Sequence, residues 1–150
     1  MVIPDTNVLL YAINSDLEQH DACRAWLEAA LSNERPVGFA WNVLLGVVRI
    51  STKKGIFPKP LSPSQAMSFV DEWLTQSPSQ VIHPTKDHSL HLHRLLSLAG
   101  TGGNLVSDAH LAALAIEHDG EVCSCDQDFD RFPGVAWFNP LTIAKSRKRT

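Results

Sequence analysis

Several features are scarce or absent in the sequence, and each narrows the range of proteins that it can encode. Cysteine occurs only at Cys23, Cys123 and Cys125, an odd number without the spacing of a disulfide or zinc framework, which favours a reducing compartment. No apolar run approaches the roughly 20 residues that cross a bilayer, and residues 1–5 do not open a secretion signal. We therefore expect a cytoplasmic protein without membrane contact.

An excess of positive charge is also missing. The 150 residues include 13 Lys and Arg against 16 Asp and Glu, which gives a formal net charge of -3. A general nucleic-acid-binding surface is basic, so the net charge does not indicate nucleic acid, although a bound cation would change the local field. Basic residues gather at the end of the chain, and we expect a single domain over residues 1–143 followed by a basic tail over residues 144–150.

What the sequence does contain is an alternation of short apolar segments with longer amphipathic or apolar ones. The expected strands cover residues 1–4, 36–40, 81–83, 121–125 and 135–138. The expected helices cover residues 16–31, 41–51, 62–76, 85–99 and 105–118, with a capping box at Ser62 and Gln65 and a cap at Thr85. Such alternation is typical of βαβ units, so an α/β fold with a parallel sheet is predicted.

Three aspartates lie where this arrangement would bring them together. Asp5 and Asp126 each follow an expected strand, and Asp108 lies in the first turn of an apolar helix. Ligands of open parallel sheets bind beyond the carboxyl ends of the strands. Each acid could instead cap a helix or begin a turn. Together they would repel one another unless a hard cation were bound, and carboxylates suit Mg²⁺ or Mn²⁺. We therefore predict metal-assisted hydrolysis of a phosphate ester.

The sequence resembles the PIN-domain nucleases, and in particular the VapC toxins of bacterial toxin–antitoxin pairs. The resemblance is carried, in order, by residues 4–12, 41–52, 103–115, 124–135 and 139–141. It implies a three-layer α/β/α sandwich with a mostly parallel central sheet. It also implies Mg²⁺- or Mn²⁺-dependent cleavage of RNA by a homodimer that a cognate VapB-type antitoxin neutralises.

The resemblance assigns catalysis and metal binding to the same three aspartates. It adds Asp128 as a further acid and Thr6 as a residue that holds the site through its hydroxyl. The sequence departs from the family at Gly46, where many members carry a glutamate three residues before an arginine, here Arg49. Gly46 either leaves room for water or marks a subgroup that uses aspartates alone. The alternative is a catalytically weak or degenerate PIN domain that binds RNA or protein.

Further residues allow more than one interpretation. A phosphatase-like enzyme with Asp5 as its nucleophile would need a second acid two residues on, where the chain has Asn7. Arg49, Lys53 and Lys54 are candidate RNA contacts, and the alternatives are a solvated loop for the lysines and an ion pair for the arginine.

Histidines in two of the expected helices are also candidate ligands. His88, His91 and His93 are expected to form a surface cluster on one helix. His110 is two residues from Asp108, cannot share its helical face, and is expected to be structural.

Overall fold

Five short strands form one parallel sheet within residues 1–147, the part of the chain that the computed structural model describes, with side chains described through residue 143. The strand order is β3-β2-β1-β4-β5. The strands are β1 (Val2–Pro4), β2 (Val37–Ala40), β3 (Ser79–Ile82), β4 (Glu121–Cys123) and β5 (Trp137–Phe138). The predicted parallel α/β fold is therefore confirmed.

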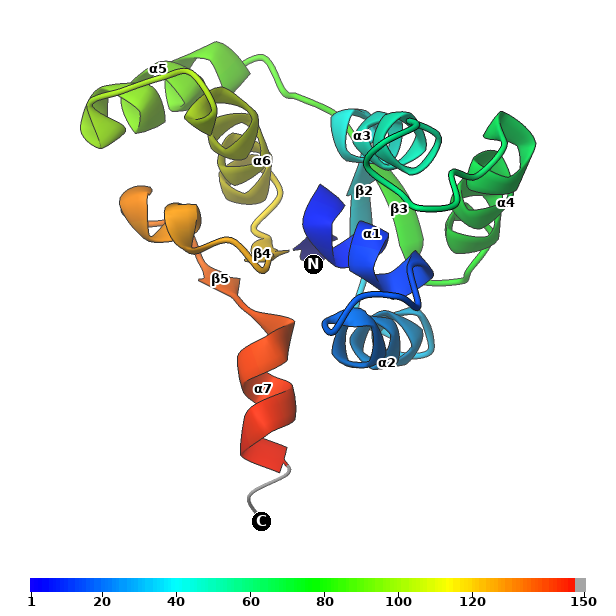
Figure 1. The fold of residues 1–150 in the computed structure, drawn as a ribbon. Coiled ribbons are helices and arrows are strands. Elements are labelled where there is room, and N and C mark those ends of the chain that lie inside the picture. The colour runs from blue at the N-terminus through cyan, green and yellow to red at the C-terminus, as the bar shows by residue number, and fades with distance from the viewer. Residues whose placement is uncertain (148–150) are drawn as a thin grey trace.

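The helices between these strands divide into two groups. They are α1 (Thr6–Ile13), α2 (His20–Leu31), α3 (Trp41–Ser51), α4 (Pro63–Leu74), α5 (His88–Ala99), α6 (Leu105–Glu117) and α7 (Pro140–Arg147), with a 3₁₀ helix, η1 (Gln127–Arg131). The connections from β1 to β2 and from β2 to β3 run toward one edge of the sheet, and they contain α1 to α4. The connection from β3 to β4 contains α5 and α6 and runs the other way. Because such crossovers are right-handed, α5 and α6 lie on the face opposite α1 to α4. Figure 1 shows α5 and α6 together, apart from α1 to α4. The result is the expected α/β/α sandwich.

The strand order reverses at β1, which has β2 on one side and β4 on the other. Val2, Ile3 and Pro4 pair with β4, whereas only Val2 pairs with β2. Pro4 has no N–H to donate, and it lies where β1 has already left β2, as the sequence predicts. The reversal lies at the carboxyl ends of β1 and β4, which is the place where ligands bind in folds of this kind.

Several helix boundaries agree with the sequence and several do not. The capping box is confirmed, because Ser62 Oγ accepts a hydrogen bond from Gln65 N at 3.1 Å and Gln65 Oε1 accepts one from Ser62 N at 2.9 Å. The cap predicted at Thr85 is wrong: the N-cap of α5 is Asp87, and Thr85 instead bonds Glu117 of α6.

The other differences lie at element ends. Helix α2 begins four residues later than expected, at His20, and β4 ends at Cys123 rather than at Cys125. Helix α7 was not expected at all, and it runs across the predicted boundary between the domain and the basic tail. Residues 148–150 of that tail lie outside the described residues, so the tail stays a prediction.

Candidate metal centre

Asp5 lies directly after β1 and is held by three donors. Its Oδ1 accepts a hydrogen bond from the backbone N–H of Thr6 at 2.6 Å, which makes Asp5 the N-cap of α1. Its Oδ2 accepts from Asn7 Nδ2 at 2.9 Å and from Ser124 Oγ at 2.7 Å. Burial raises the pKa of Asp5, and these hydrogen bonds act against that rise. The carboxylate is therefore buried, and three hydrogen bonds hold it in one orientation.

Ser124 and Asn7 connect the ends of β1 and β4. Ser124 is buried, and its Oγ accepts hydrogen bonds from Asp126 N at 3.0 Å and from Asn7 Nδ2 at 3.1 Å. The side chain of Asn7 also accepts from the backbone N–H of Cys125 at 3.0 Å through its Oδ1. The position of Asp5 is thereby coupled to that of Asp126. Sequence reasoning missed both connecting residues, whose only local signal is that each lies two positions from a predicted acid.

Asp108, Asp126 and Asp128 form the acidic cluster of the site. Each offers one carboxylate oxygen, and these oxygens lie within 4.8 Å of one another. Helix α6 presents Asp108 from its first turn, and the loop after β4 presents the other two. Asp126 caps η1 by accepting from the backbone N–H of Asp128 at 2.9 Å, so the local turn orients the Asp126 side chain.

The electrostatics of the cluster fit a bound cation. Burial, followed by the charges of Asp5, Asp126 and Asp128, raises the pKa of Asp108 to about 7. The metal-free cluster thus holds one carboxyl partly protonated at neutral pH. A hard divalent cation would remove the repulsion, and oxygen-only donors suit Mg²⁺ or Mn²⁺ better than zinc.

The predicted acids therefore occupy two levels of one site. Asp108 and Asp126 meet Asp128, the further acid named from the sequence, in the partly exposed level. Asp5 lies behind them, and its charge contributes to the raised pKa of Asp108.

Thr6 and Gly46 pack against each other beside the site. A β-carbon at position 46 would lie 3.1 Å from both Oγ1 and Cγ2 of Thr6, which is tighter than ordinary contact. The space next to Gly46 is thus filled by the Thr6 side chain. Within the described residues the hydroxyl of Thr6 has no hydrogen-bond partner, and only its backbone N–H bonds Asp5.

The basic candidates are exposed at the end of α3 and just after it. Arg49 lies in the last turn of α3, and Lys53 and Lys54 follow the helix. Among residues 1–143 none of the three forms an ion pair. Their positive charges are therefore available to a ligand, and the alternative of an ion pair for Arg49 is not realised in the described structure.

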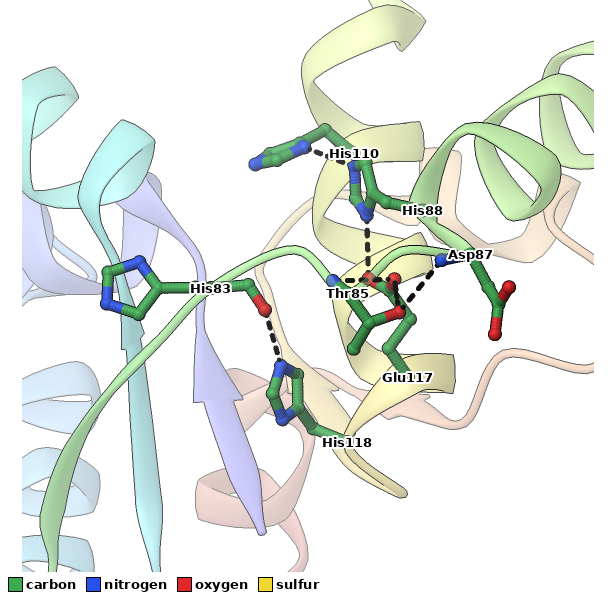
Figure 2. A network of polar contacts seen from close by, with 7 residues as sticks. All are labelled: His83, Thr85, Asp87, His88, His110, Glu117 and His118. Atoms are coloured by element: carbon green, nitrogen blue, oxygen red, sulfur yellow. Dashed lines mark hydrogen bonds and ion pairs between the residues drawn. The ribbon is translucent and has the colours of Figure 1, made fainter.

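A second polar cluster joins α5 to α6 outside the acidic site (Figure 2). Glu117 accepts hydrogen bonds from the backbone N–H and the hydroxyl of Thr85, and its Oε2 lies 2.6 Å from His88 Nδ1. His88 Nε2 lies 2.8 Å from His110 Nδ1. Only 13% of the His88 side chain and 1% of the Glu117 side chain are exposed. The expectation of a surface position for His88 is therefore wrong.

The parallel sheet and the cluster of three aspartates at its strand-order reversal are typical of one class of α/β proteins, and comparison with known proteins identifies the family. The family model described as PIN domain matches residues 2–135. The chain belongs to the PIN domain family.

Within that family the chain is similar to VapC ribonucleases. It is 49% identical over 143 residues to Ribonuclease VapC37 of Mycobacterium tuberculosis (strain ATCC 25618 / H37Rv), which covers 95% of this chain and 99% of the relative. It is also 36% identical to Ribonuclease VapC33 of the same strain. That alignment of 141 residues covers 94% of this chain and 99% of the relative.

Solved structures show the same fold. VapBC2 from Rickettsia felis, bound to a DNA fragment from its promoter, matches with a TM-score of 0.67 and 23% identity over 93% of this chain and 98% of that chain. Mycobacterium tuberculosis VapC20, a toxin that cleaves the sarcin-ricin loop, matches with a TM-score of 0.66 and 18% identity over 91% and 99% of the two chains. In the part of the chain that the structure describes, every helix is too short or too polar to cross a membrane.

Proposed function

We propose that the chain is a metal-dependent endoribonuclease and the toxin of a toxin–antitoxin pair. The observation that carries the proposal is the cluster of Asp108, Asp126 and Asp128 at the strand-order reversal of a PIN domain. The named activity of relatives at up to 49% identity over nearly the whole chain supports RNA as the substrate.

The acidic cluster would bind the metal through oxygen ligands alone. Asp108, Asp126 and Asp128 provide the nearest oxygens, and Asp5, held by Ser124, Asn7 and the Thr6 N–H, supports them from behind. We propose Mg²⁺ as the ion, with Mn²⁺ as a substitute, and a single firmly bound ion because the chain has Gly46 where a further acid would stand.

The proposed chemistry is hydrolysis of a phosphodiester. When bound, a divalent cation lowers the pKa of a coordinated water and neutralises charge that develops on the phosphate. The aspartates fix the site in space and would hold the ion against the scissile phosphate. Arg49, Lys53 and Lys54 are exposed and would contact phosphates of the RNA.

We further propose that the active form is a homodimer. Large apolar side chains are exposed on three helices, and Figure 1 shows these helices at one end of the molecule. They are Trp41 and Leu45 on α3, Leu90 and Leu98 on α5, and Val106 on α6. Exposed apolar side chains of this size are common at interfaces, and a second copy of the chain would bury them symmetrically.

The proposed partner is a VapB-type antitoxin in the cytoplasm. Similar solved structures include toxin–antitoxin complexes, among them VapBC2. The three clustered carboxylates concentrate negative charge at the carboxyl ends of the strands. A cationic side chain of an antitoxin segment would neutralise it in the same way as a metal ion, and would thereby block both metal and RNA.

Asparagine variants of the clustered acids test the activity. In Asp108→Asn and Asp126→Asn we expect Mn²⁺-dependent cleavage of total RNA to fall at least about 100-fold, because metal ligands are removed. Asp119→Asn is the matched control, since Asp119 is exposed and outside the cluster. Cleavage that persists in both ligand variants would contradict the assignment.

Gly46 supports a second candidate, a weakly catalytic PIN domain that binds RNA. The Thr6 side chain occupies the space where a glutamate side chain would begin, so the site has one fewer acid than many relatives. Saturable Mn²⁺ binding together with RNA binding but without cleavage would select this candidate over the nuclease.

A further inference from the structure

Two cysteine sulfurs meet beside the acidic cluster. Sγ of Cys23, on α2, lies 3.8 Å from Sγ of Cys125, which follows β4. Cys23 is fully buried and Cys125 is half-buried. A disulfide bond is about 2.05 Å long, so a modest approach of the two sulfurs would be enough to form one. The third thiol, Cys123, is buried and makes no hydrogen bond within the described residues.

Cys125 is placed within the hydrogen bonds that hold the acids. Its backbone N–H donates to Asn7 Oδ1 at 3.0 Å, and Asn7 in turn donates to Asp5. Its chain neighbours are Ser124, which also bonds Asp5, and Asp126, a member of the cluster. A shift of Cys125 toward α2 would therefore displace residues on both levels of the site.

We propose that Cys23 and Cys125 are a reversible oxidative modification site whose disulfide displaces residues 124–126 and weakens metal binding. The disulfide itself follows from the sulfur geometry alone. Its effect on metal rests on the proposed function.

The reaction balances with a hydroperoxide as the oxidant. The sulfur of Cys125 attacks one peroxide oxygen, the O–O bond breaks, and Cys125 becomes a sulfenic acid as water leaves. The sulfur of Cys23 then attacks the Cys125 sulfur, forming the S–S bond and releasing the hydroxyl as a second water. Two thiols and one hydrogen peroxide thus give one disulfide and two waters.

The burial of the two side chains sets the order of these steps. Solvent reaches Cys125 and not Cys23, so the oxidant meets Cys125 first and Cys23 reacts from the interior. Cys125 is itself only partly exposed, so the oxidant reaches its sulfur slowly. Excess hydroperoxide is needed, and dioxygen in ordinary buffers should leave the pair reduced.

Thiol counting after peroxide treatment tests the disulfide. The full chain is treated with hydrogen peroxide, denatured, alkylated and weighed as an intact protein. Wild type should fall from three labels to one and Cys123→Ala from two labels to none, with recovery after dithiothreitol. Cys23→Ala should not lose two labels together, and Cys23→Ser repeats that test should the alanine variant fail to fold. Retention of all three labels in wild type, or a mapped disulfide that contains Cys123, would overturn the proposal.

Mn²⁺ titration then tests the coupling, with the same proteins in reduced and oxidised form. Oxidised wild type and Cys123→Ala should bind Mn²⁺ at least about tenfold more weakly than their reduced forms, the size typical for disturbance of residues that support metal ligands. Cys23→Ala should bind equally before and after peroxide. Equal binding by reduced and oxidised wild type would refute the coupling. Absence of Mn²⁺ binding in the reduced protein would contradict the proposed function instead, while the label count would still decide the disulfide.

Discussion

Asp108 has a raised pKa, so its ionisation changes the charge of the acidic cluster near neutral pH. Its pKa of about 7 in the folded protein exceeds the ordinary value of 3.8, because of burial and then of neighbouring carboxylates. A carboxyl with a raised pKa stabilises the fold at low pH, and that contribution is lost as the pH rises from 3.8 through about 7. Without a cation, ionised Asp108 therefore destabilises the fold above neutral pH.

Asp108→Asn should accordingly stabilise the metal-free protein at pH 8. The gain is about 1 kcal/mol in the free energy of unfolding, reduced from the full pKa shift because the side chain is half open to solvent. Urea unfolding with a chelator at pH 8 and pH 5 measures it, and the gain should be small at pH 5. Added Mn²⁺ should stabilise wild type but not the variant. A variant less stable than wild type at pH 8 would contradict the electrostatic account.

Ser124 carries the connection between the two strand ends, so its hydroxyl should matter for metal affinity. Ser124→Ala removes the hydrogen bonds to Asp5, Asn7 and the Asp126 N–H. We expect Mn²⁺ affinity to fall about 10- to 100-fold, as for other residues that orient metal ligands. Calorimetric titration measures this, with Ser68→Ala on the exposed face of α4 as the control. Unchanged affinity would show that Asp5 and Asp126 are held without Ser124.

At the scale of elements, α5 is joined to α6 by the buried carboxylate of Glu117. Burial acts to raise its pKa, but hydrogen bonds from Thr85 and His88 outweigh burial and lower it below 4.5. Stability from a lowered carboxyl pKa is present above the unfolded value and is lost as the pH falls through the folded one. The junction between α5 and α6 should therefore weaken in acid.

Glu117→Gln tests this junction. The amide keeps the shape but loses the charge that His88 and Thr85 face, and we expect a loss of about 1–3 kcal/mol in unfolding free energy at pH 7. Thermal melts from pH 7 to pH 3 should show the difference narrowing as the pH falls below 4.5. Glu34→Gln on the surface should melt like wild type. A difference that does not depend on pH would rule out the charge of Glu117 as its cause.

Elements with strong local signals could be predicted from the sequence, and those decided by distant contacts could not. Helix α3 and the capping box of α4 match expectation because apolar periodicity and caps are local properties. Thr85 has an ordinary capping pattern, but Glu117, 32 positions away, takes its hydroxyl. The late start of α2 reflects the turn in which Asn14 accepts a hydrogen bond from the Asp16 N–H.

The same distinction holds in the site. The clustering of Asp108, Asp126 and Asp128 could be anticipated, since topology alone brings strand ends and the α6 start together. The roles of Ser124 and Asn7 depend on partners more than 100 positions away, for which a single sequence offers no signal. The contact of Gly46 with Thr6 depends in the same way on how α3 packs against α1.

At the scale of the whole molecule, the exposed apolar side chains of α3, α5 and α6 are the basis for expecting a dimer. Leu90 is 69% exposed and Leu45 is 60% exposed, values that are unfavourable for leucine in an isolated monomer. Burial of such side chains contributes roughly 1.5–3 kcal/mol each. A charge introduced there should therefore dissociate the pair.

Leu45→Glu should convert a dimer into a monomer, as measured by light scattering coupled to size exclusion. The physical reason is that an unpaired carboxylate would have to be desolvated in the interface. Leu17→Glu, at another exposed leucine between α1 and α2, should leave the molar mass unchanged. A monomeric wild type, or a dimeric Leu45→Glu variant, would contradict the proposed interface.

The hydrogen bond between Ser124 and Asp5 joins positions 119 apart in the chain. During synthesis on the ribosome, Asp5 therefore emerges more than 100 residues before Ser124, Asp126 and Asp128. A nascent or prematurely terminated chain that stops before Ser124 has neither the support for Asp5 nor two of the three clustered acids. The acidic cluster can therefore form only after residue 128 has been synthesised and has folded back onto the end of β1.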